Sequence, residues 1–285
     1  MSSTDRAKQA EKDYARLAGS LPWERTKPFA PAGHDMVGES AALIRDFAVM
    51  LACLAPVPGE TILDLGAGSG WCSEWLQRLN VDAVAVDLAT DMLRVARERL
   101  PRPGRVVAGD LEHLPFRSAS VDAAVCLNAF HHVPDMRLAL GEIHRVLKPG
   151  GRALFSEPGR GHAETDTSRH AIESFGVTEQ DILVTPFLKS CHDAGFDRVR
   201  LKPIAYVVPY FEADLARWTE WHRVADTPRP LRAARKLWLN LLEMVGLGKH
   251  GPLFQDAVGM ELLRILRHAM ADHPIVVATK GEASR

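Results

Sequence analysis

Residues 62–71 read ILDLGAGSGW, and this stretch decides the fold. An apolar run leads into glycines at positions 66, 68 and 70, and an amphipathic helical pattern follows over 71–79. Glycine lets the backbone adopt positive φ angles and approach a ligand closely. The N–H groups that open the following helix point toward such a ligand. The stretch therefore predicts a buried strand, a tight ligand-binding turn and a helix.

The spacing of the glycines argues against two phosphate-binding loops. A nicotinamide dinucleotide site carries GxGxxG after its first strand, whereas here Trp71 stands where the third glycine belongs. A Walker-type loop ends in Gly-Lys-Ser/Thr, which is absent after Gly70. Asp87 follows Gly66 at the distance expected of a carboxylate that binds ribose hydroxyls. That distance is shared by the ribose of NAD and the ribose of any other adenosine.

Outward from this turn, short runs rich in β-branched residues alternate with helical patterns. This alternation predicts βαβ units, a parallel sheet buried on both faces and right-handed crossovers. The fold class is thus α/β, a doubly wound open sheet. Strands are expected at 61–66, 82–87, 105–109, 121–127 and 152–157, and helices at 71–79, 90–100 and 135–147.

The flanking regions predict three further parts. Residues 1–58 form a helical N-terminal cap in which 21–34, rich in proline, make an extended linker. The sheet core covers 59–208 and 273–285, with a helix at 186–194 and further strands at 197–208 and 275–280. Residues 209–272 are predicted to be a helical insertion that acts as a lid over an acceptor molecule.

Composition excludes several classes of protein. The 285 residues carry 35 Lys+Arg against 36 Asp+Glu, a balance that disfavours nucleic acid as a partner. We find no apolar stretch long enough to span a membrane and no secretory signal, and the four cysteines lie far apart, which favours a cytoplasmic protein. No metal-ligand spacing is evident, so no metal site is predicted. The oligomeric state stays open.

Five segments that cover about residues 60 to 157 together resemble the motif series of the Rossmann-like, class I S-adenosylmethionine-dependent methyltransferases. They are ILDLGAGSG, AVDLATDML, GDLEHLPF, VDAAVCLNAFHHVPD and LKPGGRALFSEPG, in this order. The resemblance implies S-adenosylmethionine as cofactor and a seven-stranded sheet whose last strand is antiparallel. The helical insertion 209–272 departs from the family pattern and leaves the shape of the acceptor pocket open.

The same resemblance implies which residues contact the cofactor. Two other interpretations stay open: Asp64 bracing the glycine turn, and Asp87 capping the next helix. The implied contacts are Asp64, Gly66, Ala67 and Gly68 for the methionine end, Asp87 for the ribose, Leu88 and Met92 for the adenine face, Asp110 and Leu111 for the adenine edge, and Asn128 for the ammonium group.

Two residues are candidates for catalysis, His131 first and Glu157 second. Both follow strands at the edge where parallel sheets bind ligands. We expect His131 to face the pocket and His132 to pack under the loop. A base is needed only for an acceptor that is protonated near neutral pH.

The sequence thus predicts a methyltransferase acting on a small molecule, such as a secondary metabolite or a sugar-type compound. Three alternatives remain. They are an enzyme that uses the same cofactor for a non-methylating step such as cyclisation, a non-catalytic cofactor-binding subunit, and an oxidoreductase, which the displaced third glycine disfavours.

Overall fold

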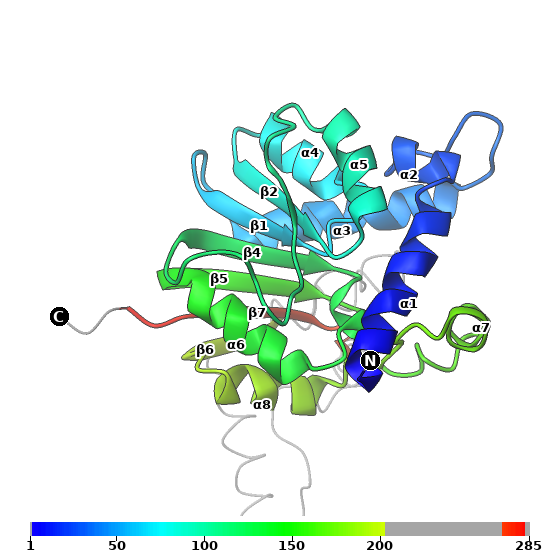
Figure 1. The fold of residues 1–285 in the computed structure, drawn as a ribbon. Helices are drawn as coiled ribbons and strands as arrows, with labels where there is room; N and C mark the ends of the chain where they lie inside the picture. The colour runs from blue at the N-terminus through cyan, green and yellow to red at the C-terminus, as the bar shows by residue number, and fades with distance from the viewer. Residues whose placement is uncertain (1, 203–269, 283–285) are drawn as a thin grey trace, which may run out of the picture. The chain divides into compact units, whose positions relative to one another are not determined.

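The computed structural model describes residues 2–202 and 270–282 (Figure 1). Contacts divide the chain into two units, Met1–Ala205 with Met270–Arg285, and Tyr206–Ala269. All described residues belong to the first unit. The predicted insertion over 209–272 lies outside the described residues except for 270–272, so the division into cap, core and insertion stays a prediction.

The described residues form a sheet of seven strands in the order β3-β2-β1-β4-β5-β7-β6. Strands β1 to β5 pair in parallel, and β7 is antiparallel to both β5 and β6. This confirms the predicted α/β fold and its reversed final strand. The strands are β1 Thr61–Leu65, β2 Asp82–Asp87, β3 Val106–Ala108, β4 Val121–Leu127, β5 Leu147–Ser156, β6 Arg198–Lys202 and β7 Ile275–Thr279.

Helices α4 to α8 follow the first strand in the chain, and α1 to α3 precede it. One expectation is wrong in part: the segment 21–34 is not extended throughout, because α2 occupies its first half. Pro22 opens this helix, a position where the missing N–H of proline costs nothing. The helices are α1 Ser3–Ala18, α2 Pro22–Thr26, α3 Val37–Leu54, α4 Trp71–Arg78, α5 Thr90–Arg99, α6 Met136–Val146, α7 Asp166–Phe175 and α8 Val184–Asp193, with a 3-10 helix, η1, at Phe130–His132.

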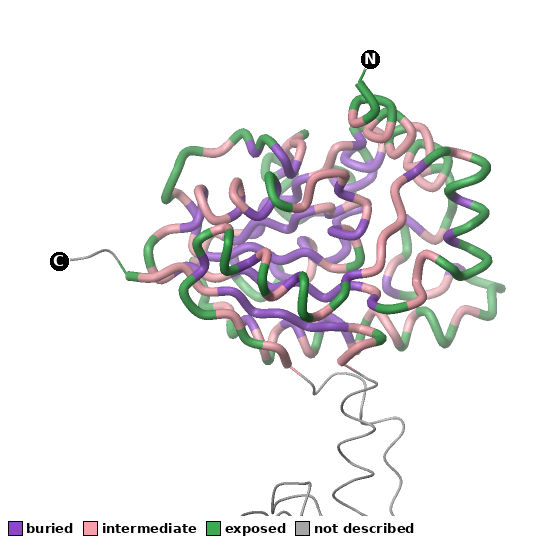
Figure 2. The backbone as a smooth tube through the Cα atoms, turned by 90° about the horizontal axis from the view of Figure 1, so that it is seen from below, coloured by how far each residue is buried: buried purple, intermediate pink, exposed green. Residues whose placement is uncertain are grey.

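Alternation along the strands divides the core into two faces. In β2, Val84 and Val86 belong to the larger apolar cluster, which also holds residues of α6 and α8. Their neighbour Ala85 belongs to a second cluster with Leu93 and Ala96 of α5. Figure 2 shows the result as buried strands in the centre, with exposed helical turns outside them. Burial on both faces is what a parallel sheet requires.

The topology places the turns after β1, β2 and β4 at one edge of the sheet, because parallel strands end on the same side. Ligands of open α/β sheets bind at this edge. Within residues 2–202 and 270–282, no helix combines the length and apolarity needed to cross a bilayer.

Candidate active site

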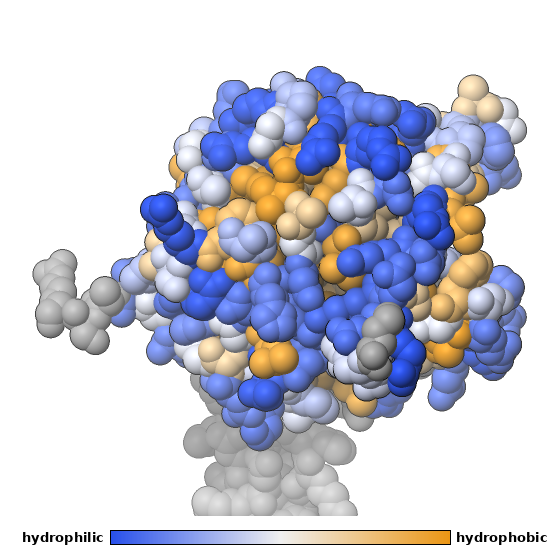
Figure 3. Space-filling model, in the orientation of Figure 1, coloured by the Kyte–Doolittle hydropathy of each residue, from blue (hydrophilic) through white to orange (hydrophobic). Residues whose placement is uncertain are grey.

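A cavity of about 340 Å³ lies at this carboxyl edge of the sheet. Its walls are the turn after β1, the ends of β2 and β4, residues 110–111 and one side of α1. In the space-filling view, hydrophobic residues gather in the upper centre of the face and hydrophilic residues surround them (Figure 3). The volume is in the range typical of small-molecule sites, roughly 300–1,000 Å³.

The glycine turn is fixed by its backbone and by close packing. Gly66, Gly68 and Gly70 all have positive φ angles, of 68°, 52° and 74°. The amides of Gly66 and Ala67 donate to Val86 O at 2.8 and 3.0 Å, which ties the turn to β2. A Cβ on Gly66 would lie 2.3 Å from the Cβ of Ala129. The turn therefore needs glycine at position 66 for both conformation and space.

Asp87 links the end of β2 to the glycine turn. Its two carboxylate oxygens accept hydrogen bonds from Gly68 N and Ala89 N, each at 2.8 Å. The side chain lines the cavity, and burial raises its pKa. The N-cap residue of α5 is Ala89 rather than Asp87, so the capping interpretation is wrong.

Asp64 lies behind the turn and is not among the residues that line the cavity. Only 2% of the residue is exposed, and its Oδ2 accepts hydrogen bonds from Ser73 N at 2.9 Å and Ser73 Oγ at 2.6 Å. It therefore braces the first turn of α4. Burial raises the pKa of Asp64 to about 6, against an ordinary value of 3.8.

This raised pKa predicts a pH-dependent stability. Between pH 3.8 and about 6 the folded chain holds a proton on Asp64 that the unfolded chain has released, so stability falls as pH rises through this window. The shift corresponds to about 3 kcal/mol. We expect Asp64→Asn, which retains an oxygen acceptor for Ser73, to lose this part of the slope. Urea unfolding at several pH values measures it, and parallel profiles of the two proteins would contradict it.

The other residues implied as cofactor contacts do line the cavity. Asp110 also forms an ion pair: its Oδ2 lies 2.6 Å from Lys8 Nζ, and Lys8 contacts Glu112 as well. Helix α1 is thereby joined to the loop after β3. The lining residues from this implied set are Gly66, Ala67, Gly68, Asp87, Leu88, Met92, Asp110, Leu111 and Asn128.

The adjacent histidines are oriented differently from the expectation. His131 is 4% exposed, and its Nδ1 lies 2.8 Å from Glu157 Oε2. Glu157 is fully buried and also accepts hydrogen bonds from the amides of Ala129 and His131. Neither His131 nor Glu157 lines the cavity, whereas His132 does. The pocket-facing orientation expected of His131 is therefore wrong for this cavity, because the buried Glu157 draws its ring inward.

The electrostatics of this pair fit a carboxylate beside a neutral imidazole. Burial favours a raised pKa for Glu157, but the hydrogen bonds from His131 and the backbone outweigh it, so the pKa of Glu157 is lowered. Burial lowers the pKa of His131 despite the neighbouring carboxylates. The pair holds the segment after β4 in place.

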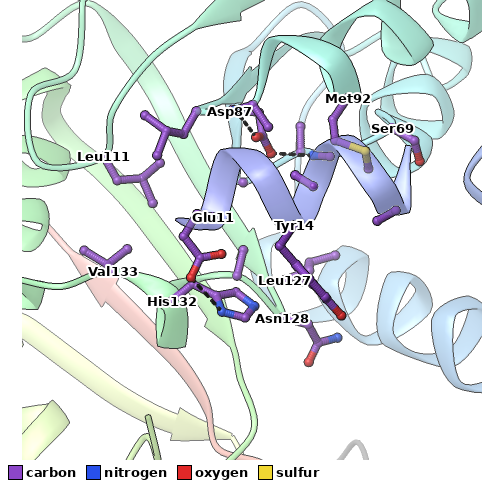
Figure 4. A pocket seen from close by; sticks show the side chains of 18 of the residues that line it. Glu11, Tyr14, Ser69, Asp87, Met92, Leu111, Leu127, Asn128, His132 and Val133 are labelled. Atoms are coloured by element: carbon purple, nitrogen blue, oxygen red, sulfur yellow. Dashed lines mark hydrogen bonds and ion pairs between the residues drawn. The ribbon is translucent and has the colours of Figure 1, made fainter. Parts of the chain in front are cut away.

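The sequence predicts that the helical parts within residues 1–55 help to build the pocket, but it does not single out the residues of α1 that form its wall. Glu11 of this wall faces His132, with 3.7 Å between Oε1 and Nδ1 (Figure 4). Tyr14 of the same helix lies beside Leu127 and Asn128 in this view. The helical spacing of the wall is a sequence signal that would have shown that these residues share a face. They are Lys8, Glu11, Tyr14, Ala15 and Ala18.

The residues present fit S-adenosylmethionine. The glycine turn is a cradle that a Cβ at position 66 would disrupt, and Asp87 places a carboxylate beside it. Ser69 is 1% exposed, and its hydroxyl has no hydrogen-bond partner among the described residues although the residue lines the cavity. A buried hydroxyl of this kind calls for a partner from a ligand. No lysine lies in the turn itself, as suits a ligand without phosphate.

Comparison with known proteins supports this assignment. Residues 63–155 match the family model described as a methyltransferase domain. A demethylmenaquinone methyltransferase of Renibacterium salmoninarum is 31% identical over 181 residues, which cover 62% of this chain and 68% of that protein. One of Clavibacter sepedonicus is 37% identical over 140 residues, 48% of this chain and 54% of that protein. The chain thus spans about half to two thirds of these two relatives.

A solved structure shares the fold. The phosphoethanolamine N-methyltransferase 2 of Haemonchus contortus, in complex with S-adenosyl-L-methionine, has a TM-score of 0.57 and 18% identity. The match covers 99% of this chain and 60% of that one. With the motif order, the sheet topology and the sequence relatives, this chain belongs to the class I S-adenosylmethionine-dependent methyltransferases.

Proposed function

We propose that the chain transfers a methyl group from S-adenosylmethionine to a small molecule bound in the same cavity. One observation carries this proposal: the cofactor-type residues Asp87 and Asp110 share a single cavity with Glu11 and His132. A donor site and a polar acceptor site thus open into one space. Direct methyl transfer requires this proximity.

The cofactor end of the cavity is assigned to the turn after β1 and to the acids that follow it. Gly66, Ala67, Gly68 and the Ser69 hydroxyl bind the methionine part, and Asp87 the ribose. Asp64 acts on the site indirectly, by bracing α4. Leu88, Met92, Asp110, Leu111 and Asn128 complete the contacts. When bound, S-adenosylmethionine supplies a methyl group on a positively charged sulfur.

The acceptor end is assigned to α1 and the segment after β4. Apolar side chains, among them Leu43, Leu127 and Val133, line the cavity together with His132 and Glu11. This mixture suits a partly apolar molecule with a polar reacting group. The chain's main contribution to rate is to hold the acceptor in line, since correct orientation alone lowers the barrier substantially. His131 and Glu157 contribute indirectly, because their hydrogen bonds fix the backbone that carries His132.

The acceptor itself is proposed only as a class. Both sequence relatives described above are named for demethylmenaquinone, an aromatic molecule with an apolar tail. The apolar side chains of the cavity, Leu43, Leu127 and Val133, are compatible with an aromatic acceptor of this kind, and also with other secondary metabolites.

The experiment that tests the function couples binding with turnover. Calorimetry of the full chain is expected to show binding of S-adenosylhomocysteine and none of NAD. Incubation with radiolabelled S-adenosylmethionine and an aromatic acceptor panel is expected to release S-adenosylhomocysteine and label one acceptor. Binding without label transfer to any acceptor, or with an altered but unmethylated acceptor, would favour the subunit or cyclisation alternative. Binding of NAD alone would contradict the proposal.

His132 gives a prediction at the acceptor end. His132→Asn is expected to lower turnover about 100-fold, the lower end of the range for loss of a group that assists proton transfer. Its affinity for S-adenosylhomocysteine is expected to stay within about threefold, since such a split separates turnover from binding. Steady-state kinetics and calorimetry measure the two. His113→Gln, which changes a largely exposed side chain, is the matched control, and equal turnover in His132→Asn and wild type would remove His132 from the site.

A further inference from the structure

Two groups of described residues bring histidine and carboxylate ligand atoms within 4.8 Å of one another. One consists of Asp110, Glu112 and His113, and the other of His131, His132 and Glu179. In the first, the two carboxylates already have a cation, because Lys8 Nζ contacts both. In the second, within the part of the chain that the structure describes, every ion-pair partner of Glu179 is a histidine.

Two segments distant in sequence build the second group. His131 and His132 lie in η1, after β4, and Glu179 lies between α7 and α8. The side chains of His131 and Glu179 are only 5% and 8% exposed. The 3.5 Å between His131 Nε2 and Glu179 Oε2 is close to the separation of about 3.4 Å between two ligands of a tetrahedral zinc ion with bonds near 2.1 Å.

Two of the three side chains, His131 and Glu179, also have an outer partner. His131 Nδ1 lies 2.8 Å from Glu157 Oε2. His132 differs, because its Nδ1 lies both 3.9 Å from Glu179 Oε1 and 2.7 Å from Thr178 O. Glu179 Oε2 lies 2.8 Å from His162 Nε2. Histidines that bind metals almost always donate their other ring N–H to a carboxylate or carbonyl, and ligating carboxylates are themselves hydrogen-bonded. His131 and Glu179 are therefore already oriented by outer contacts, and His132 is held beside them by Thr178.

We propose that His131, His132 and Glu179 form a binding site for a divalent transition metal ion of the zinc class. Two imidazoles and one carboxylate suit zinc and its neighbours better than magnesium or calcium, which prefer oxygen ligands. Three protein ligands leave at least one coordination position open, the arrangement of metal sites that bind a further molecule.

The open coordination position of the metal would face the cavity and could bind an acceptor molecule there. His132 is the ligand that also lines the cavity, next to Glu11 of α1. An acceptor with an ionisable oxygen, such as a phenol or an enol, would bind the metal through that oxygen. This last step rests on the proposed methyl transfer, whereas metal binding itself does not.

Metal binding is tested with the full chain after treatment with a chelator. Equilibrium dialysis against Zn²⁺, followed by elemental analysis, is expected to give one tightly bound equivalent per chain that Glu179→Gln does not bind. Co²⁺ in place of Zn²⁺ is expected to give visible absorption bands of a low-coordinate site. Unchanged Zn²⁺ binding in Glu179→Gln, or only the spectrum of hydrated Co²⁺ in the wild type, would overturn the proposal.

A graded variant set separates ligation from a general structural effect. His162→Asn, an outer partner with a 26% exposed side chain, is expected to weaken Zn²⁺ binding by roughly 10- to 100-fold. His113→Gln, in the group that Lys8 neutralises, is expected to leave binding unchanged; loss there instead would assign the ion to that group and overturn the proposal. Calorimetry with S-adenosylhomocysteine on the same proteins reports separately on the cofactor site.

Discussion

Asp87→Ala is expected to weaken binding of S-adenosylhomocysteine by about 100-fold or more. The carboxylate lines the cavity and is assigned to the ribose hydroxyls, and each hydrogen bond to a charged group contributes about 1.5–3 kcal/mol. Two such bonds give at least about 3 kcal/mol, or two orders of magnitude in affinity. The variant also releases Gly68 N and Ala89 N, which loosens the turn before any ligand binds. Calorimetric titration of both proteins measures the loss.

Asp91→Ala is the matched control for this variant. Asp91 lies in the first turn of α5, its side chain is 32% exposed, and it pairs with Arg94 outside the cavity. We expect its affinity for S-adenosylhomocysteine to equal that of the wild type. Similar affinities in Asp87→Ala and Asp91→Ala would show that the ligand does not use the end of β2, and would refute the assigned site.

Gly66→Ala is expected to have the second large effect, on stability and binding together. The new methyl group would lie 2.3 Å from Ala129 Cβ, and the φ angle of 68° disfavours any side chain. Left-handed strain of about 1–2 kcal/mol and overpacking of about 1–3 kcal/mol together predict a loss near 3 kcal/mol in the free energy of unfolding. Urea denaturation measures this loss, and calorimetry is expected to show weakened binding of S-adenosylhomocysteine.

Two further variants separate strain from collision. Gly59→Ala has an even more positive φ of 87° but nothing within 4 Å of the added methyl, so only the strain of about 1–2 kcal/mol is expected. The double variant Gly66→Ala with Ala129→Gly removes the colliding methyl and is expected to recover the overpacking part. Additive effects of the two single substitutions would contradict the proposed contact.

The sheet could be predicted from sequence because its signals are local. Each strand of the parallel core is a short apolar run, and each ends near a residue with a distinct chemical role, such as Asp87 or Asn128. The glycines at 66, 68 and 70 require conformations that few other residues adopt, which fixes the turn. Because β1 pairs in parallel with β2 and β4, the residues at the ends of these strands lie close together, whatever their side chains are.

The acceptor end could not be predicted in the same way, because long-range contacts determine it. Which of two adjacent histidines faces the cavity depends on Glu157, which directly follows β5 and holds His131 inward. The distance between Glu179 and η1 is likewise invisible in the sequence, since 47 positions separate residues 132 and 179. Asp64 has the residue type of a ligand contact, but it is turned toward Ser73 by the pleat of β1.

Helix α1 contributes to the cavity from outside the stretch that matches the methyltransferase domain model, residues 63–155. It has no buried residue of its own, so its inner side is not constrained by the packing of the sheet. Under the proposed assignment, substitutions on this one row of the helix would change which acceptors fit while the turn assigned to the donor keeps its own residues. Directed evolution toward a new acceptor would begin at positions 11, 14, 15 and 18.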